Sequence, residues 1–499
     1  MTSSPSTPEP SFEGEVDFIE DFGPGIDPAE MAVFLRVAEQ VTRLETGHPD
    51  QVAARRATSG LYKLAKKFRR FEKRRIEAEH DAAVIAATAT GSPGRIDDET
   101  QGLQITSQTT AAIAGTLLNA QPCYVCKRDF TQVDWFYHQL CPECAALNHA
   151  KREARTDLTG RRALLTGGRA KIGMYIALRL LRDGADLTIT TRFPKDAARR
   201  FAAMADSADW LHRLTIVGID LRDPAQVVAL ADEVASRGPL DILINNAAQT
   251  VRRSPGAYSA LADAETKELP DDPQVPTITF GRTSAAHPAM LAGSVTDLPS
   301  TAVAPGGVAR AALTAASASL ERHLAGTAID AGGLLPDEVD HNSWVANVED
   351  VDPMELLEVQ LCNSTAPFIL LSRLRGALSS TATGRSYVVN VSAMEGVFNR
   401  GYKGPGHPHT NMAKAAVNML TRTSGTELAE NGVYMTSVDT GWITDERPHT
   451  TKIRLAQEGL HAPLDLVDGA ARVYDPIVRG ENGELLHSCF LKDYSRAAW

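Results

Sequence analysis

The chain has 499 residues, which is more than one ordinary hydrophobic core organises, so we expect two or more folded units. Its 43% hydrophobic and 23% charged residues, with no apolar run of about 18 residues, are typical of a globular protein and exclude a membrane-spanning chain. The formal net charge of -11 argues against nucleic acid as a partner of the whole molecule.

The first segment of the chain is acidic. Residues 1–27 are rich in Ser, Pro and Glu and hold too little apolar surface to offset the entropy lost on ordering, so we expect a disordered tail. This segment has neither the basic stretch nor the apolar stretch of a secretory signal. We therefore expect a cytoplasmic protein.

A helical region follows over residues 28–90. Leu61, Leu64, Phe68 and Phe71 recur at three- and four-residue steps, which is the spacing of one helix face. The same helix carries a cluster of basic side chains, namely Lys63, Lys66, Lys67, Arg69, Arg70, Lys73, Arg74 and Arg75. The preferred interpretation is the solvated face of a helix packed on the rest of the protein. The alternative is contact with nucleic acid or with an acidic partner.

Four of the six cysteines lie close together in the sequence. Cys123 and Cys126 form one Cys-x2-Cys pair, and Cys141 and Cys144 form a second pair after fourteen intervening residues. Two such pairs close a tetrahedron of thiolates around Zn²⁺, and four cysteine ligands leave no open position for catalysis. The spacing predicts a small zinc-ribbon-like module over residues 115–152 with a structural zinc ion. It leaves open whether this module binds a partner or braces the protein.

From residue 157 to the end of the chain, apolar runs typical of strands alternate with helical patterns. This alternation is the signature of βαβ units and predicts an α/β fold, a doubly wound Rossmann fold with a parallel sheet. The alternation breaks over residues 251–352, which are rich in Ala, Gly, Pro, Ser and Thr. We interpret this stretch as a partly ordered insertion in the Rossmann fold.

The strongest functional motif is a glycine-rich turn between a strand and a helix in RRALLTGGRAKIGMYIALRLLRDGADLTITTR. A turn in this position brings backbone N–H groups close to a pyrophosphate at a helix N-terminus. It resembles the Thr-Gly-x-x-x-Gly-Ile-Gly turn of the short-chain dehydrogenases, with Lys171 in place of the middle glycine, where a lysine would neutralise phosphate charge. The turn residues that the resemblance assigns to the cofactor are Thr166, Gly167, Arg169, Lys171, Ile172 and Gly173.

The end of the second strand indicates which dinucleotide is bound. An NAD-preferring domain places a carboxylate there for the ribose 2′-hydroxyl. Here the chain reads Thr190, Thr191 and Arg192, so no acid is present and a guanidinium is available for a 2′-phosphate. We therefore expect NADP rather than NAD. The alternative is that Arg192 is merely solvated at a strand end.

Two further motifs of the short-chain dehydrogenases follow in the family's order. Asp220 and Leu221, after the strand RLTIVGI, resemble the pair that contacts adenine. Asn246, Ala247 and Ala248, after the strand DILI, resemble the turn that lies against the cofactor. The resemblance therefore implies that these residues line the dinucleotide site.

Three more matches belong to the nicotinamide end of that site. Asn363 resembles the helix asparagine that carries a water molecule to the active-site lysine of the family. Lys414 resembles that lysine, whose ammonium holds the nicotinamide ribose. Gly441, Trp442 and Ile443 stand where the family holds the carboxamide, so the resemblance implies cofactor contacts for Gly441 and Ile443.

Two catalytic positions of the family differ in this chain. The family's tyrosine acid stands four residues before the lysine, where this chain has Thr410, and a threonine hydroxyl is far too weak an acid for the same role. The family's serine corresponds to Ala393. Ser392 is one residue away, and because side chains alternate along a strand we expect it to face the other way.

The loop before Lys414 offers substitute acids in GVFNRGYKGPGHPHTNMAKAA. Tyr402 is the first choice, since a loop that folds back would bring its hydroxyl to the vacant phenol position. His409 is the second, because an imidazole titrates near neutral pH. The alternative, given equal weight, is that both are ordinary loop residues.

Two main hypotheses for function result. The first is an NADP-dependent oxidoreductase with altered acid-base residues that passes hydride between nicotinamide and a carbonyl or alcohol substrate. The second is a catalytically inactive NADP-binding protein whose zinc module serves regulation or a partner interaction, and a weaker third makes the N-terminal half a nucleic-acid module. We expect a dimer or tetramer, because the last segment resembles the strand through which the family contacts a neighbouring subunit, and we expect no membrane partner.

Overall fold

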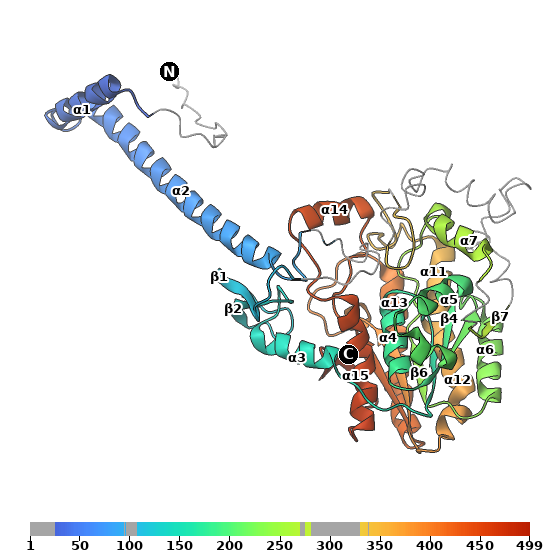
Figure 1. Ribbon diagram of the computed structural model, residues 1–499. Coiled ribbons are helices and arrows are strands. Elements are labelled where there is room, and N and C mark those ends of the chain that lie inside the picture. Colours follow the sequence, from blue (N-terminus) through green and yellow to red (C-terminus); the bar gives the residue numbers. More distant parts are fainter. Residues whose placement is uncertain (1–24, 94, 96–106, 270–274, 281–329, 338) are drawn as a thin grey trace, which may run out of the picture. The chain divides into compact units, whose positions relative to one another are not determined.

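The computed structural model describes residues 25–93, 95, 107–269, 275–280, 330–337 and 339–499 (Figure 1). Residues 1–24 of the predicted acidic tail and residues 281–329 of the predicted insertion therefore lie outside the described residues. The chain divides into two compact units, Met1–Ala78 and Glu79–Trp499. No helix among the described residues is both long and apolar enough to cross a membrane.

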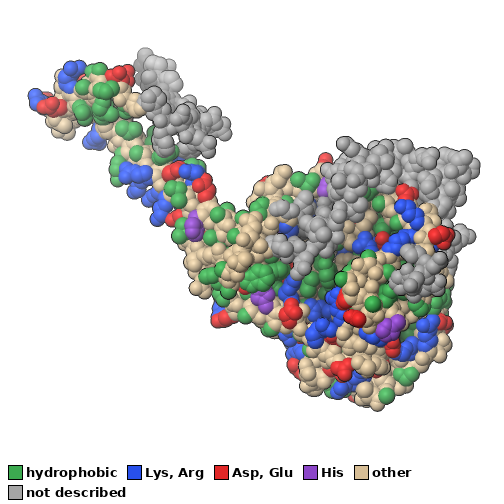
Figure 2. All heavy atoms as spheres, in the orientation of Figure 1, with side chains coloured by type: hydrophobic (Ala, Val, Ile, Leu, Met, Phe, Trp, Pro, Cys, Tyr) green, Lys and Arg blue, Asp and Glu red, His purple; other side chains and the backbone are tan. Residues whose placement is uncertain are grey.

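Two helices fill the described part of the first unit, α1 (Pro28–Thr42) and α2 (Pro49–Ala86), and the last turns of α2 belong to the second unit. The Asp27 carboxylate caps α1 by accepting the N–H of Ala29 at 2.6 Å. Neither helix has a buried residue, and Leu61 and Leu64 are 59% and 60% exposed. Basic side chains also gather along α2 in Figure 2. The surface of α2 therefore offers both apolar and basic side chains to solvent.

One large sheet organises the second unit and confirms the predicted doubly wound α/β fold. Its strand order is β11-β10-β9-β8-β6-β3-β4-β5-β7, and each neighbouring pair is parallel except β10 with β11. β4 and β5 lie on one side of β3, and β6, β8 and β9 lie on the other, so the strand order reverses between β3 and β6. In doubly wound folds, ligands bind outside the carboxyl ends of the strands at this point. The strands are β3 (Arg162–Leu165), β4 (Asp186–Thr191), β5 (Leu214–Gly218), β6 (Ile242–Asn245), β7 (Thr277–Thr279), β8 (Ser386–Ser392), β9 (Val433–Asp439), β10 (Cys489–Lys492) and β11 (Ser495–Ala497).

Helices cover both faces of this sheet, as Figure 1 shows. Successive strand residues point to opposite faces, so Leu165 joins one hydrophobic core and Leu164 joins the other. The first core is completed by α4 (Lys171–Arg182), α5 (Pro194–Ala202) and α15 (Leu466–Glu481). The second is completed by α6 (Pro224–Ser236), α12 (Ala366–Ser379) and the end of α13 (Pro408–Ala429).

The predicted insertion contributes to the sheet itself. Within residues 251–352 the structure places α7 (Ser259–Thr266) and the short strand β7, which pairs with β5. Three residues are too few to show a strand pattern, which is why the sequence did not reveal β7. The remaining helices of the Rossmann part are α11 (Pro353–Gln360), a π-helical segment (Leu361–Thr365) and α14 (His449–Gln457), with 3-10 turns at Ser207–Asp209, Leu211–Arg213, Pro255–Tyr258 and Met394–Gly396.

The four cysteines lie in a small unit that we call the four-cysteine module, residues 113–152. It consists of the antiparallel strands β1 (Ile113–Pro122) and β2 (Asp129–Asp134), followed by α3 (Pro142–Arg152). Its core contains Phe136 and Leu140, and it also includes Ile443 and Leu464 from the Rossmann part. The module and the Rossmann fold therefore share one hydrophobic core within the second unit.

Candidate functional site

The glycine-rich turn after β3 is tightly fixed to the end of β6. The Thr166 hydroxyl accepts the backbone N–H groups of Asn246 and Ala247, each at 3.0 Å. In return, the Asn246 amide donates to the carbonyl oxygens of Thr166 and Gly167, each at 3.1 Å. A Cβ on Gly173 would lie 1.9 Å from the Gly167 carbonyl oxygen, so only glycine fits there. The start of α4 is thereby held against the crevice, where helix N-termini bind phosphate.

Lys171 has the backbone conformation that suits the glycine of the motif at this position. Its φ is +54°, in the left-handed region that favours glycine, and it begins α4. Its ammonium lies 3.3 Å from the Asp330 carboxylate, which comes from the insertion. The backbone of this turn thus has a conformation that glycine would also adopt, and the lysine ammonium is paired with a carboxylate.

The Arg169 side chain turns toward α5. Its guanidinium lies 2.5 Å from the Asp196 carboxylate and packs over the Phe193 ring at 5.1 Å. Burial is the main cause that lowers the pKa of Arg169. Arg200 shares the same carboxylate at 2.7 Å, so Asp196 holds two cations at the edge of the turn.

Two guanidinium groups flank the ends of β4 and β5. Arg192 follows β4, and its guanidinium lies 5.2 Å from the ring centre of Tyr258. Arg222 follows β5 and pairs with the carboxylates of Asp220 at 2.6 Å and Glu358 at 3.1 Å. Burial alone would raise the pKa of Asp220, but the Arg222 hydrogen bonds outweigh burial and lower it. Sequence reasoning missed Arg222 and Tyr258, because nothing local pairs them with Arg192.

Two other residues that were predicted to line the dinucleotide site differ in exposure. Leu221 is buried in the second core, whereas Ala248 is exposed after β6. Asn363 stands on the π-helical segment and makes two hydrogen bonds with the backbone of Gln249, accepting its N–H at 2.7 Å and donating to its carbonyl at 2.9 Å. Asn363 therefore fixes the segment that follows β6.

Lys414 lies on α13 with its ammonium directed at the end of β8. Its Nζ donates to the carbonyl oxygen of Val391 at 2.8 Å. Burial lowers the pKa of Lys414 to about 8, although nearby Glu395 and Asp439 favour its charged form. Burial also raises the pKa of Asp439 to about 6 at the end of β9. Asp439 is a titratable group of this region that the sequence motifs did not single out.

The two positions that the resemblance assigns to a catalytic tyrosine and serine are altered, and of these Thr410 is buried whereas Ala393 is half-buried. Thr410 is 3% exposed, and its hydroxyl has no hydrogen-bond partner among the described residues. The Ser392 hydroxyl donates to the Asn418 side chain at 2.7 Å, so it is directed toward α13. Ala393, at the serine position, offers no polar side chain.

The two substitute acids lie in different environments. Tyr402 is 77% exposed, so the structure does not bring its hydroxyl into the buried site. His409 is buried, and its Nε2 lies 3.7 Å from the carboxylate of Glu355 on α11. Burial alone would raise the pKa of Glu355, but its interactions with His409 and Ser343 outweigh burial and lower it. An ionised carboxylate therefore faces the imidazole.

The four predicted metal ligands converge in the four-cysteine module. The Sγ atoms of Cys123, Cys126, Cys141 and Cys144 all lie within 4.8 Å of one another, and those of Cys126 and Cys141 are 3.7 Å apart. Thiolates about 2.3 Å from a tetrahedral zinc ion are roughly 3.8 Å apart, so the donor set and its spacing fit zinc. Lys127, with a φ of +63°, closes the turn after the first pair.

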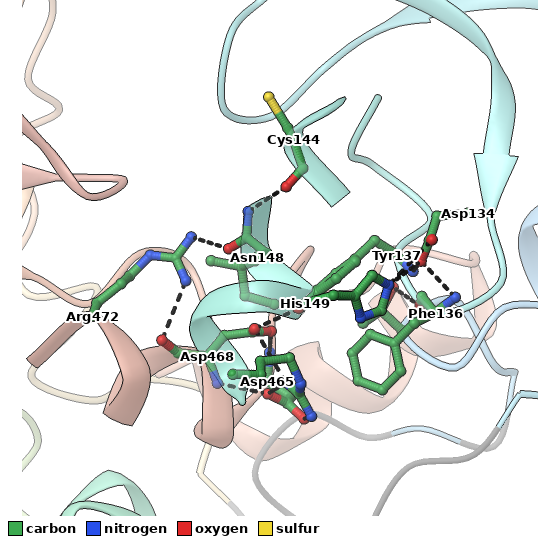
Figure 3. A network of polar contacts seen from close by, with 12 residues as sticks. Asp134, Phe136, Tyr137, Cys144, Asn148, His149, Asp465, Asp468 and Arg472 are labelled. Carbon is green, nitrogen blue, oxygen red and sulfur yellow. Dashed lines mark hydrogen bonds and ion pairs between the residues drawn. The ribbon is translucent and has the colours of Figure 1, made fainter. Parts of the chain in front are cut away.

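Buried polar contacts join the module to α15 (Figure 3). Asp468 accepts a hydrogen bond from the Tyr137 hydroxyl at 2.6 Å and lies 3.1 Å from the Arg152 guanidinium. Arg152 also pairs with Asp465 at 2.6 Å, while Arg472 donates to the Asn148 side chain at 2.9 Å. These contacts join residues more than 300 positions apart in the chain.

Gly441 and Ile443 lie where the module meets the Rossmann part. Gly441 has a φ of +78°, and the Trp442 N–H donates to the Tyr124 hydroxyl oxygen at 2.8 Å. Ile443 is buried in the core of the module. The structure thus brings the turn after β3, Lys414 and the 441–443 segment to the carboxyl ends of neighbouring strands of one sheet.

Comparisons with known proteins match parts of this chain. Residues 161–319 match the family described as short chain dehydrogenase. An uncharacterized protein of Acanthamoeba polyphaga mimivirus is 28% identical over 379 residues, covering 72% of this chain and 71% of that protein. A probable oxidoreductase of Streptomyces antibioticus is 44% identical over 91 residues, which cover 18% of this chain and only 30% of that protein.

Solved structures are also similar to this chain. The carbonyl reductase from chicken fatty liver, solved with NADPH, is 18% identical, and the alignment covers 68% of this chain and 100% of that one with a TM-score of 0.42. The carbonyl reductase Sniffer of D. melanogaster is 17% identical with the same TM-score and the same two coverages.

Proposed function

We propose that this chain, of which residues 161–319 match the short chain dehydrogenase family, is an NADP-dependent oxidoreductase that passes hydride between nicotinamide and a carbonyl or alcohol substrate. The observation that carries this proposal is the turn after β3, where Gly173 leaves no room for a side chain and Asn246 fixes the backbone. Such a turn at the start of a helix leaves backbone N–H groups free for a diphosphate.

The charges at the ends of β4 and β5 support NADP over NAD. No carboxylate follows β4, and Arg192 occupies that position with Tyr258 beside it. The nearby Asp220 carboxylate is already paired with Arg222, so it would not repel a 2′-phosphate. A guanidinium suits phosphate because it donates parallel hydrogen bonds in a fixed plane.

For proton transfer, His409 is the residue we favour. It is buried, and its Nε2 lies 3.7 Å from the carboxylate of Glu355, which would orient the ring. Lys414, held by the Val391 carbonyl, would bind the nicotinamide ribose. Tyr402 is a weaker candidate because its side chain is largely exposed.

At the four cysteines we propose a structural zinc ion. When bound, zinc would cross-link the two Cys-x2-Cys turns, and four thiolate ligands would leave it no position for substrate. The acid-base chemistry is therefore assigned to the Rossmann part alone.

A second candidate is a catalytically inactive NADP-binding protein. It is favoured by Thr410 and Ala393 at the two altered positions, neither of which supplies a usable acid. In this case the dinucleotide would serve recognition or regulation rather than turnover.

One experiment tests both candidates. NADPH binding is measured by calorimetry on the full chain, and NADPH oxidation is followed at 340 nm across a panel of aldehydes and ketones. Binding with substrate-dependent oxidation supports the oxidoreductase. Binding without turnover across the panel supports the inactive protein, and absence of binding overturns both.

A further inference from the structure

Tyr124 connects the four-cysteine module to the segment proposed to hold the carboxamide. It lies between Cys123 and Cys126 in the sequence, and its hydroxyl oxygen accepts the Trp442 N–H at 2.8 Å. Its own backbone N–H donates to the Gln139 carbonyl at 2.8 Å, so the residue is anchored inside the module.

The module and α15 leave no spare room around Gly441. A Cβ at this position would lie 2.6 Å from Leu464, 3.3 Å from the Nε of Arg472 and 3.6 Å from the Tyr124 hydroxyl. Leu464 belongs to the core of the module, and Arg472 belongs to the polar contacts with α3. The backbone of this segment is therefore shaped by groups that the module itself positions.

The glycine-rich turn, at the phosphate half of the proposed dinucleotide site, also contacts α15. A Cβ on Gly469 of α15 would lie 3.0 Å from Ile443 and 3.3 Å from Ile172 of the glycine-rich turn. The two isoleucines thus pack on one glycine, one from each end of the proposed cofactor site. A shift of α15 would reach both, and the 441–443 segment also has a direct hydrogen bond to the module.

The position of α15 depends on charges supplied by the module. At its start Asp468 is buried and Asp465 is half-buried, and Arg152 from α3 pairs with both. Lys151 pairs with Asp475, about two turns after Asp468, at 2.5 Å. Removing one member of a buried pair leaves an uncompensated charge, so α15 is stable in this position only while α3 is in place.

We propose that the four-cysteine module is a metal-dependent support for the nicotinamide half of the cofactor site, with Tyr124 as its positioning residue for residues 441–443. This inference rests on the proposed function, because it assigns the carboxamide to that segment. A bound metal fixes the turn that carries Tyr124, and Tyr124 fixes the Trp442 backbone. Loss of either weakens contacts to nicotinamide while the phosphate turn keeps its own hydrogen bonds to Asn246.

The test compares two ligands on one variant. NADPH contains nicotinamide, whereas 2′,5′-ADP carries only the adenosine and its phosphates. Tyr124→Phe removes one hydroxyl, and loss of one hydrogen bond is expected to raise the Kd of NADPH about fivefold while that of 2′,5′-ADP stays unchanged. Tyr434→Phe on β9, whose ring packs near His487, is the matched control and is expected to change neither Kd.

Two results of this comparison would overturn the inference, and a third would overturn the proposed function. Equal weakening of both ligands would mean that the module merely stabilises the whole fold, and no weakening would mean that Tyr124 positions nothing; either overturns the inference. If the wild-type chain binds neither ligand, the proposed function itself has failed.

A second arm removes the metal, in case Tyr124→Phe does not fold. The wild-type chain is treated with a zinc chelator, and circular dichroism checks that the helices remain. The ratio of the NADPH Kd to the 2′,5′-ADP Kd is expected to rise severalfold. An unchanged ratio, or loss of the whole fold on chelation, contradicts a support confined to the nicotinamide half.

Discussion

A Cβ on Gly173 would lie 1.9 Å from the carbonyl oxygen of Gly167, so the first turn of α4 and the turn before it touch backbone to backbone. Gly173→Ala must therefore move one of the two backbones. We expect NADPH binding at least about tenfold weaker, because the N–H groups that face the diphosphate are displaced. Calorimetry measures this directly.

Gly376→Ala provides the control for that substitution. Gly376 is exposed on α12, and a Cβ there meets nothing within 4 Å. Because alanine favours a helix over glycine, the variant is expected to gain about 1 kcal/mol in unfolding free energy with unchanged NADPH binding. Equal binding by both variants would show that the turn does not hold the cofactor.

Arg192→Leu is expected to lower the affinity for NADPH by about tenfold or more and to leave that for NADH unchanged, because only NADPH carries a 2′-phosphate for the guanidinium. Arg182→Leu is the control, since Arg182 pairs with Asp206 near the other end of α4. The measurement is the ratio of the NADPH Kd to the NADH Kd, taken for each variant and for the wild-type chain. A parallel fall for both cofactors would place Arg192 outside the 2′-phosphate site.

His409→Gln is expected to lower kcat by about a hundredfold if the buried imidazole transfers the proton. Tyr402→Phe should change kcat less than about twofold, because the exposed hydroxyl lies outside the buried site. Both are measured with the best substrate of the carbonyl panel. A large fall in kcat for Tyr402→Phe, with little change for His409→Gln, would assign the acid to the loop and not to α13.

The pKa of Lys414 predicts how stability changes at alkaline pH. Burial lowers it to about 8 in the folded chain from 10.5 for an ordinary lysine. Between these values the unfolded chain holds the extra proton, so the Lys414 contribution to stability rises with pH across this window. Relative to Lys414→Met, the wild-type chain should gain about 3 kcal/mol in unfolding free energy from pH 7 to pH 10.5. Urea unfolding of both chains checks this, and a constant difference would contradict it.

Metal content tests the four-cysteine cluster. The wild-type chain is expected to contain about one zinc ion, and Cys126→Ser should lose it because three thiolates bind zinc more weakly than four. Cys362→Ala, which lies outside the cluster, should keep the metal. Elemental analysis of freshly purified protein gives the answer. A metal-free wild-type chain with four reactive thiols would exclude the zinc centre.

The sequence predicted the parts of this fold that depend on local pattern. Two features are local patterns, namely the alternation of strands and helices and the turn from Thr166 to Gly173. Both could therefore be predicted from the sequence alone. The pairing of Lys171 with Asp330 joins distant segments through an insertion without a regular pattern. The exposure of Tyr402 likewise depends on how a glycine- and proline-rich loop packs. The spacing of residues in the sequence predicts neither the Lys171–Asp330 ion pair nor the exposure of Tyr402.

The ion pairs between α3 and α15 bear on how this chain can be shortened. Cutting near residue 157, where the Rossmann pattern begins, would remove Arg152 from Asp465 and Asp468 and leave Asp475 paired only with Arg479. It would also uncover Ile443 and Leu464. Such a fragment would lack part of its own interior. A shortened chain that keeps this interior therefore has to include the four-cysteine module, which belongs to the same compact unit as the Rossmann part.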